Sequence, residues 1–199
     1  MAYQPKAEEI KGLRELTDAP MMDCRKALVE ADGDVARARQ LLLERGAAQA
    51  QKKAERVANE GVVASYIHAG GKIGVLVEVN SETDFVARNP KFAELARDVA
   101  MHIAAMSPRY VDRTAVPAEE VSRVRAQLRD EVPANKPAEI AEKIVEGKLN
   151  KWYEETVLLD QPFVKDDDMT VGDRINAAVG ALGENIRIRR FAKFALGEE

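Results

Sequence analysis

Apolar residues recur at helical spacing in three short segments near the N-terminus. Turn residues separate these segments at positions 17–20, where Pro20 suits the first turn of a helix, and at positions 32–34, where Asp34 suits an N-cap. The residues expected on the buried faces are Ile10, Leu13, Leu16, Met21, Cys24, Leu28, Ala31, Val35, Ala38, Leu41 and Leu42. The pattern predicts a compact three-helix unit.

The third of these helices is expected to end at Gly46, because glycine commonly follows the last turn of a helix. The alanine-rich, polar stretch that follows contains no proline and is typical of a helical linker. We therefore predict a three-helix module over residues 1–46, a helical linker over residues 47–60 and a core domain over residues 61–199.

Two stretches of the core domain have strand character. Residues 61–80 are rich in Val, Ile and Tyr around Gly70-Gly71, which predicts a β-hairpin. Residues 185–197 alternate between apolar and polar positions, which predicts a half-buried strand able to join the hairpin. On this pattern Ile186, Ile188, Ala192, Phe194 and Leu196 share the buried face.

The remaining core segments have helical periodicity. Residues 89–106, starting at Asn89-Pro90, and residues 170–183 each predict one helix, with Thr170 as a cap. Residues 117–132 and 137–159 each have a proline near the start and predict an antiparallel helical hairpin within 117–159. The fold class is therefore α+β, with a small antiparallel sheet packed with helices.

Composition narrows the class of function. Of the 199 residues, 46% are hydrophobic, 32% are charged, and the net charge is −4, which disfavours a protein whose main task is direct nucleic-acid binding. The single cysteine, Cys24, fits a reducing compartment and is expected to be a small buried residue. No apolar run is long enough to span a membrane, and no signal or transit peptide is recognisable. We expect a cytoplasmic protein.

Known catalytic motifs are missing from the sequence. It contains no phosphate-binding loop, dinucleotide fingerprint, paired-cysteine motif or zinc-protease motif. The histidines His68 and His102 are each more consistent with a non-catalytic role, and the aspartates of "VKDDDMT" lack calcium-loop spacing, so a solvated turn is expected there. The sequence predicts no cofactor and no metal site.

Two places break the inside–outside pattern and are candidate contact surfaces. Met21 and Met22 are adjacent, so both cannot lie at the centre of one helical stripe; Met21 fits the core, and Met22 falls at its margin. Either one methionine is buried and the other is partly buried, or the pair forms an adaptable apolar contact that Arg14 borders.

The second place lies within "VNSETDFVARNP", between a strand and a helix. Pattern alone favours Asp84 as a turn cap and Phe85 as a plug beneath the sheet. The polar neighbours and the position on a loop between rigid elements favour exposure for binding instead.

Several motifs resemble the elongation factor Ts family of bacteria. They are "LRELTDAPMMDCRKAL", "VEVNSETDFVARNPKF", "AEKIVEGKLNKWYEE", "LLDQPFVKDD" and "GENIRIRRFAKFALGE", which occur in the family's order. The length indicates a compact form with a single core subdomain. In place of the family's frequent Thr-Gly-Ala-Gly turn, this chain has Thr17-Asp18-Ala19-Pro20, which changes the turn geometry expected before Met21.

The resemblance implies a guanine nucleotide exchange factor for elongation factor Tu, with a ubiquitin-associated (UBA-like) N-terminal module. It implies that Arg14, Met21 and Met22 contact the GTP-binding domain of the partner. It also implies that Thr83, Asp84, Phe85 and Val86 dislocate the partner's Mg²⁺, with Phe85 as a wedge between helices. His68 is a weak further candidate for the interface.

Other interpretations stay open. Compact members of the family can form a homodimer and a 2:2 complex, and the strand over residues 185–197 is a candidate interface. A ribosome- or RNA-associated module would use the basic stretches at residues 51–56 and 187–190. An enzyme would need a site at Cys24 or His68.

Overall fold

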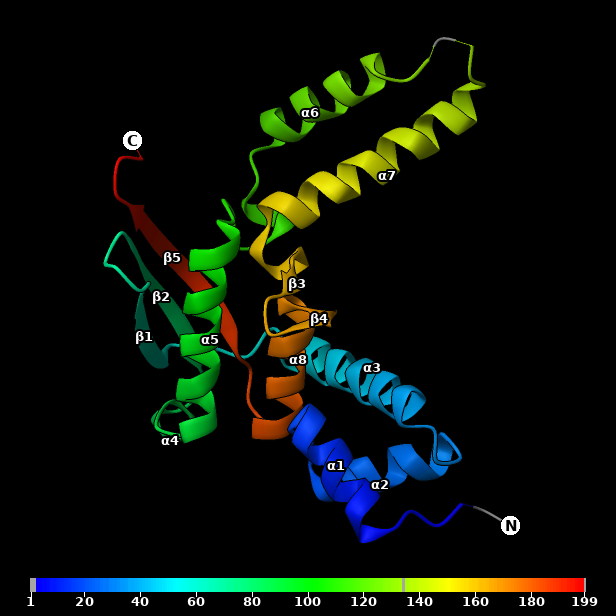
Figure 1. Cartoon of the computed structure of the whole chain (residues 1–199), viewed down its shortest axis with the longest axis vertical. Helices are drawn as coiled ribbons and strands as arrows, with labels where there is room; N and C mark the ends of the chain where they lie inside the picture. The colour runs from blue at the N-terminus through cyan, green and yellow to red at the C-terminus, as the bar shows by residue number, and fades with distance from the viewer. Residues whose placement is uncertain (1–2, 134, 199) are drawn as a thin grey trace.

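The structure is a computed structural model that describes residues 3–133 and 135–198. Figure 1 shows an N-terminal pair of helices, a central body around one sheet and a long helical hairpin that extends away from the body. The helices are α1 (Ala7–Thr17), α2 (Met21–Glu30), α3 (Val35–Lys53), α4 (Asp84–Ala87), α5 (Pro90–Met106), α6 (Ala118–Asp130), α7 (Ala138–Thr156) and α8 (Val171–Leu182). The strands are β1 (Glu60–Ile67), β2 (Ile73–Ser81), β3 (Pro162–Phe163), β4 (Asp166–Thr170) and β5 (Arg187–Ala195). The predicted α+β class is confirmed.

The main sheet is antiparallel and has the strand order β1-β2-β5. Gly70 and Gly71 both have positive φ in the hairpin turn, a conformation that glycine adopts without strain. The helix α5 packs against β1 and β2 and buries Phe92, Leu95 and Val99 under one face of the sheet. Asn89 caps α5 as expected, because its side chain accepts a hydrogen bond from the Lys91 backbone amide.

The prediction for the last strand is wrong over its C-terminal half. Ile188 pairs with Val79, but Arg190 pairs with Glu78, so Arg189 is an extra residue in a β-bulge. Past the bulge the alternation is inverted, because one inserted residue exchanges the two faces of a strand. Phe194 and Leu196 are therefore 70% and 80% exposed rather than buried.

In the N-terminal helices the core is smaller than the pattern predicted. Leu13, Cys24 and Leu28 are buried against one another and against α3. Leu16 is 62% exposed and Val35 is 44% exposed instead, and each lies at an end of its helix. Burial raises the pKa of the Cys24 thiol, which fits the small buried residue that was expected.

The helix α3 does not end at Gly46 but continues to Lys53. A Cβ atom at Gly46 would come within 3.2 Å of the Asn176 backbone oxygen on α8, so the missing side chain allows the two helices to approach closely. This glycine serves helix packing in place of helix termination. The single helix α3 therefore connects the N-terminal helices to the body.

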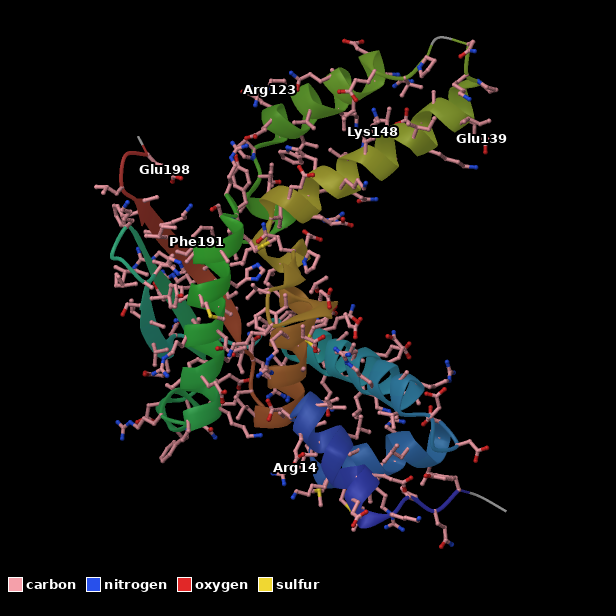
Figure 2. The ribbon with its side chains drawn as sticks, in the orientation of Figure 1. Arg14, Arg123, Glu139, Lys148, Phe191 and Glu198 are labelled. Carbon is pink, nitrogen blue, oxygen red and sulfur yellow. The ribbon has the colours of Figure 1, made fainter. Side chains whose placement is uncertain are left out.

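The predicted helical hairpin is confirmed as α6 and α7, each of which begins after a proline. Figure 2 labels Arg123, Glu139 and Lys148 along its charged surface. Between the two helices, Arg125 forms ion pairs with Glu142 at 2.9 Å and Glu146 at 2.6 Å.

The aspartate-rich segment forms the strand β4, paired with β3, in place of the solvated turn that was predicted. Arg39 of α3 binds Asp166 at 2.5 Å and Asp168 at 2.8 Å, so two of these carboxylates balance one cation. Thr170 caps α8 as expected, in a capping box with Asp173. No helix within residues 3–133 and 135–198 is long and apolar enough to cross a membrane.

Candidate functional site

The segment between β2 and α5 contains a four-residue helix, α4, where only a loop was expected. The Thr83 hydroxyl caps this helix by accepting a hydrogen bond from the Val86 amide at 3.4 Å. Val86 packs against the main core and Ala87 is buried, while Phe85 points outward and is 83% exposed. The interpretation of Phe85 as a plug beneath the sheet is therefore wrong, since Val86 and Ala87 occupy the inward side of the turn.

A carboxylate from the far end of the chain holds this turn in place. Glu184 Oε2 accepts hydrogen bonds from the amides of Glu82 at 3.1 Å and Thr83 at 3.0 Å, and Oε1 accepts from the Thr83 hydroxyl at 2.6 Å. In return, Glu82 Oε1 accepts from the Asn185 amide at 2.6 Å. We call this reciprocal arrangement of Glu82, Thr83, Glu184 and Asn185 the carboxylate clasp.

The carboxylate clasp was missed at the level of sequence. Glu184 lies 101 residues after Thr83, and nothing in the local pattern indicates which side of a turn a single glutamate faces. The one sequence feature that could have pointed to it is Gly183 directly before Glu184. Its positive φ ends α8 and turns the chain toward β5. Because the clasp fixes the capping residue itself, it orients Phe85 without touching it.

Charged groups flank the exposed ring. Arg88 forms an ion pair with Asp84 across one helical turn, at 3.0 Å. An aromatic side chain on a braced turn is suited to insertion into an apolar pocket of another molecule, with the ion pair at its rim. Asp84 does not cap the turn as was considered, because Thr83 has that role.

A second exposed apolar surface lies on the N-terminal helices. Met21 is 46% exposed and Met22 is 57% exposed, so Met21 is not a core residue as the pattern predicted. The reason is its place in the first turn of α2, where Pro20 precedes the helix and Cys24 is the first residue to reach the core. Arg14 is exposed on α1, and Figure 2 shows it on the side of the module that faces α4.

His68 lies apart from both of these surfaces. It is exposed at the tip of the hairpin, where its Nδ1 is 3.1 Å from the Tyr66 hydroxyl. The nine-residue strand β2 lies between this tip and Thr83, which corresponds to roughly 30 Å at the usual strand rise. The structure therefore does not bring His68 together with Phe85.

His102 is fully buried and has a structural environment. Its Nε2 lies 2.9 Å from the Gln161 side-chain oxygen, and its Nδ1 accepts a hydrogen bond from the Val164 amide at 3.2 Å. These partners fit a neutral ring that donates from Nε2. Burial lowers the pKa of His102, in agreement with that neutral state.

Metal-binding groups do not gather in the described part of the chain: no cluster of three or more His, Cys, Asp or Glu side chains is arranged to hold an ion there. Exposed apolar side chains on rigid turns are typical of proteins that bind another macromolecule. The exposed side chains on this fold therefore indicate the class of proteins that act by binding another macromolecule.

Comparisons with known proteins identify the family. The family model for elongation factor TS matches residues 44–198. An elongation factor Ts of Koribacter versatilis is 54% identical over 193 residues, covering 96% of this chain and 88% of the relative. Elongation factor Ts proteins of Anaeromyxobacter sp. and Geobacter sulfurreducens are 55% and 54% identical over 196 residues, with 96% of this chain covered and 88% and 89% of the relatives. The chain belongs to the elongation factor Ts family, whose role is nucleotide exchange on elongation factor Tu.

Proposed function

We propose that residues 83–86 enter elongation factor Tu beside its Mg²⁺ site, with Phe85 as a wedge that displaces the ion and loosens GDP. The observation that carries this proposal is the 83% exposure of Phe85 on a turn that the carboxylate clasp holds in place. An aromatic ring left in water is unfavourable for the isolated chain. Its exposure is explained if a partner covers it.

The physical basis of exchange is a competition for the partner's conformation. Mg²⁺ neutralises phosphate charge, so moving it weakens nucleotide binding. Each ~1.4 kcal/mol removed from the release barrier speeds release about tenfold. By linkage, the factor must bind the nucleotide-free partner more tightly, and an incoming nucleotide then expels the factor. The direction of exchange follows the ratio of GTP to GDP in the cell.

The N-terminal helices provide the second contact in this proposal. We assign residues 1–46 to a UBA-like module in which Arg14, Met21 and Met22 contact the GTP-binding domain. The exposure of both methionines supports this assignment, because flexible thioether side chains adapt to a partner surface. The proposed linker is residues 47–60 and the proposed core domain is residues 61–199. His68 stays a weak candidate for the edge of the interface.

We further propose that the chain forms a homodimer through the uncovered face of its main sheet and binds elongation factor Tu in a 2:2 complex. The exposed apolar residues of this open face are Val63, Ile67, Leu76, Phe194 and Leu196, from all three strands. The same face carries an ion pair between Glu78 and Arg190 at 2.7 Å, and the exposed apolar side chains gain from being covered by a partner. A second copy supplies the same surface, as a twofold interface requires.

In this proposal the factor acts in the cytoplasm, where elongation takes place, and has no catalytic group or cofactor of its own. Its work is done by binding energy that favours one state of the partner. The buried positions of Cys24 and His102 support the absence of chemistry at these two residues.

The proposal is tested by release of mant-GDP from elongation factor Tu, with and without the chain at micromolar concentration. Asp84→Ala combined with Phe85→Ala is expected to reduce the acceleration at least about tenfold, which corresponds to ~1.4 kcal/mol. The melting temperature should stay nearly unchanged, since Phe85 is 83% exposed. The matched control is Val57→Ala, which truncates another exposed apolar side chain and should leave release unaffected. Full acceleration by the double variant would refute the role of residues 83–86.

A further inference from the structure

The turn between α1 and α2 contains a residue in a costly backbone conformation. Asp18 has φ 57° and ψ 4°, in the left-handed region that glycine adopts freely and other residues adopt at a cost. Its amide donates a hydrogen bond to the Arg14 carbonyl and so ends α1. A glycine would donate that same backbone hydrogen bond without strain, so the cap does not explain why a carboxylate is present.

The side chain of Asp18 instead reaches two elements of the body. Its Oδ1 accepts a hydrogen bond from Lys91 Nζ at 2.7 Å, and its Oδ2 accepts from Arg174 at 3.2 Å. Lys91 lies in the first turn of α5, directly after the segment that presents Phe85. Arg174 lies on α8, and its side chain is only 17% exposed. One carboxylate therefore links the N-terminal helices to both α5 and α8.

The region around this link is hollow. A cavity of about 530 Å³ separates the α1–α2 turn from the body, and Asp18 and Arg174 are among its lining residues. Leu16 borders the same cavity and is 62% exposed, so it does not fill the space. Figure 1 shows α1 beside the end of α8, with α3 as the chain connection between the two regions. Close packing does not fix the orientation of the α1–α2 turn across this cavity. The directional ion pairs of Asp18 are suited to fixing it instead.

We propose that Asp18 is a positioning residue for exchange, which holds the Met21–Met22 surface at a fixed distance from Phe85. This inference rests on the proposed contact of elongation factor Tu with both surfaces. A partner that binds two surfaces at once gains affinity when their separation is set in advance. The expected effect of losing Asp18 is therefore a higher KM for the Tu·GDP complex with an unchanged kcat.

The chain contains a matched control for this idea. Asp32, in the turn between α2 and α3, also has a left-handed conformation, with φ 51°. It forms no ion pair with any residue that the structure describes. Asp18→Gly and Asp32→Gly relieve the same type of strain, but only Asp18→Gly removes the link to α5 and α8. Asp18→Asn tolerates the same backbone conformation and removes only the charge.

The first experiment measures how firmly the N-terminal helices are held relative to the body in the free chain. Spin labels at Arg25→Cys on α2 and Arg97→Cys on α5 report the distance between the module and the body, and the buried native Cys24 reacts slowly. We expect Asp18→Gly and Asp18→Asn to broaden the distance distribution and Asp32→Gly to leave it narrow. Equal widths in all variants would overturn the positioning role, whatever the function of the protein.

The second experiment measures exchange by the same variants without labels. We expect Asp18→Gly and Asp18→Asn to raise KM about threefold to fivefold. A change of this size corresponds to the free energy that two partly exposed ion pairs contribute together. The melting temperature of Asp18→Gly should change little, because relief of the backbone strain offsets the lost ion pairs. Asp32→Gly should exchange as the wild type does. A wild-type KM in both Asp18 variants would overturn the proposal, while failure of the proposed contact itself would appear as wild-type activity in the Asp84→Ala, Phe85→Ala protein.

Discussion

Two exposed apolar regions of this chain differ in nearly every physical respect. At α4, a single aromatic ring is exposed, with Asp84 and Arg88 beside it, and the carboxylate clasp holds its backbone. On the open face of the main sheet, the apolar side chains of Val63, Ile67, Leu76 and Phe194, with Leu196 just after β5, form a wide surface, and an ion pair between Glu78 and Arg190 lies on the same face. The first region is small and rigid, and the second is broad and regular.

The difference indicates two kinds of association. A single aromatic ring with one acidic and one basic neighbour buries little area when it binds. It can therefore enter a partner and leave again during each cycle of exchange. A broad apolar sheet face gains from lasting cover, because its contribution grows with the area removed from water. We therefore expect changes at α4 to affect exchange and changes on the open face to affect the assembly of the chain.

The strongest change should be in the assembly of the chain. Phe194→Glu introduces a charge among the apolar side chains of the open face, and a buried charge without a partner is strongly unfavourable. We expect the dissociation constant of the homodimer to rise at least about a hundredfold, or ~2.7 kcal/mol, in sedimentation velocity. The melting temperature of the monomer should change little, because Phe194 is 70% exposed. A wild-type chain that sediments as a monomer at high concentration would contradict the proposed dimer.

The next effect concerns the carboxylate clasp. Glu184→Ala removes the acceptor of three hydrogen bonds to residues 82 and 83. We expect exchange to fall about tenfold, since a ring that samples many orientations must be ordered at the moment of binding. Glu184→Gln keeps one side-chain oxygen and should restore part of the activity.

The control for that experiment is Glu139→Ala on α7, a glutamate on the exposed hairpin that Figure 2 labels. It should exchange as the wild type does. Equal losses in Glu184→Ala and Glu139→Ala would show that the comparison between α4 and the rest of the surface is wrong.

A smaller effect is expected at the N-terminal surface. Met22→Ala removes part of an apolar contact that is 57% exposed in the free chain. Steady-state exchange should show a KM about threefold to tenfold higher, or ~0.7–1.4 kcal/mol, at an unchanged kcat. A fall in kcat with constant KM would indicate that this surface acts on the nucleotide site itself.

A separate effect, on stability and not on exchange, is a pH dependence that arises at His102 in α5, the helix that follows α4 and covers the inner face of the sheet. Burial lowers the pKa of His102 below its value in the unfolded chain, so the unfolded state binds a proton more readily. The free energy of unfolding should therefore be highest above about pH 6.5 and decrease as the pH falls below it, with a slope of at most ~1.4 kcal/mol per pH unit. Urea unfolding at pH 7.5 and 5.5 measures this decrease.

His102→Gln is the matched variant, because it removes the titrating ring at the same position. It should lower stability at pH 7.5, where the buried ring is well packed, and should show a smaller decrease between the two pH values. A pH dependence identical to that of the wild type would show that other groups cause it.

Much of the fold follows from the sequence because the signals are local. The helix starts at Asp34, Asn89 and Thr170 were predicted correctly, since each side chain caps the backbone within a few residues of itself. The hairpin turn at Gly70-Gly71 was also predicted, because positive φ values there suit glycine.

The incorrect predictions concern residues whose environment is set by contacts with distant parts of the chain. Gly46 has the signature of a helix end, but close packing on α8 determines its role. Phe194 has the alternation of a buried residue, but the bulge at Arg189 inverts the faces of β5. The clasp by Glu184 depends on a contact across 101 residues, which no local pattern encodes.

Two matched phenylalanine variants, Phe85→Ala and Phe194→Ala, separate the roles of the two regions when each is assayed for mant-GDP release from elongation factor Tu. Both rings are largely exposed in the single chain, at 83% and 70%, so neither substitution should lower the melting temperature of the monomer appreciably. The prediction is that Phe85→Ala loses at least about tenfold of the acceleration, or ~1.4 kcal/mol, while Phe194→Ala retains it when compared per chain. Release at the wild-type rate by Phe85→Ala would contradict the claim that this ring is the part of the molecule that loosens the nucleotide.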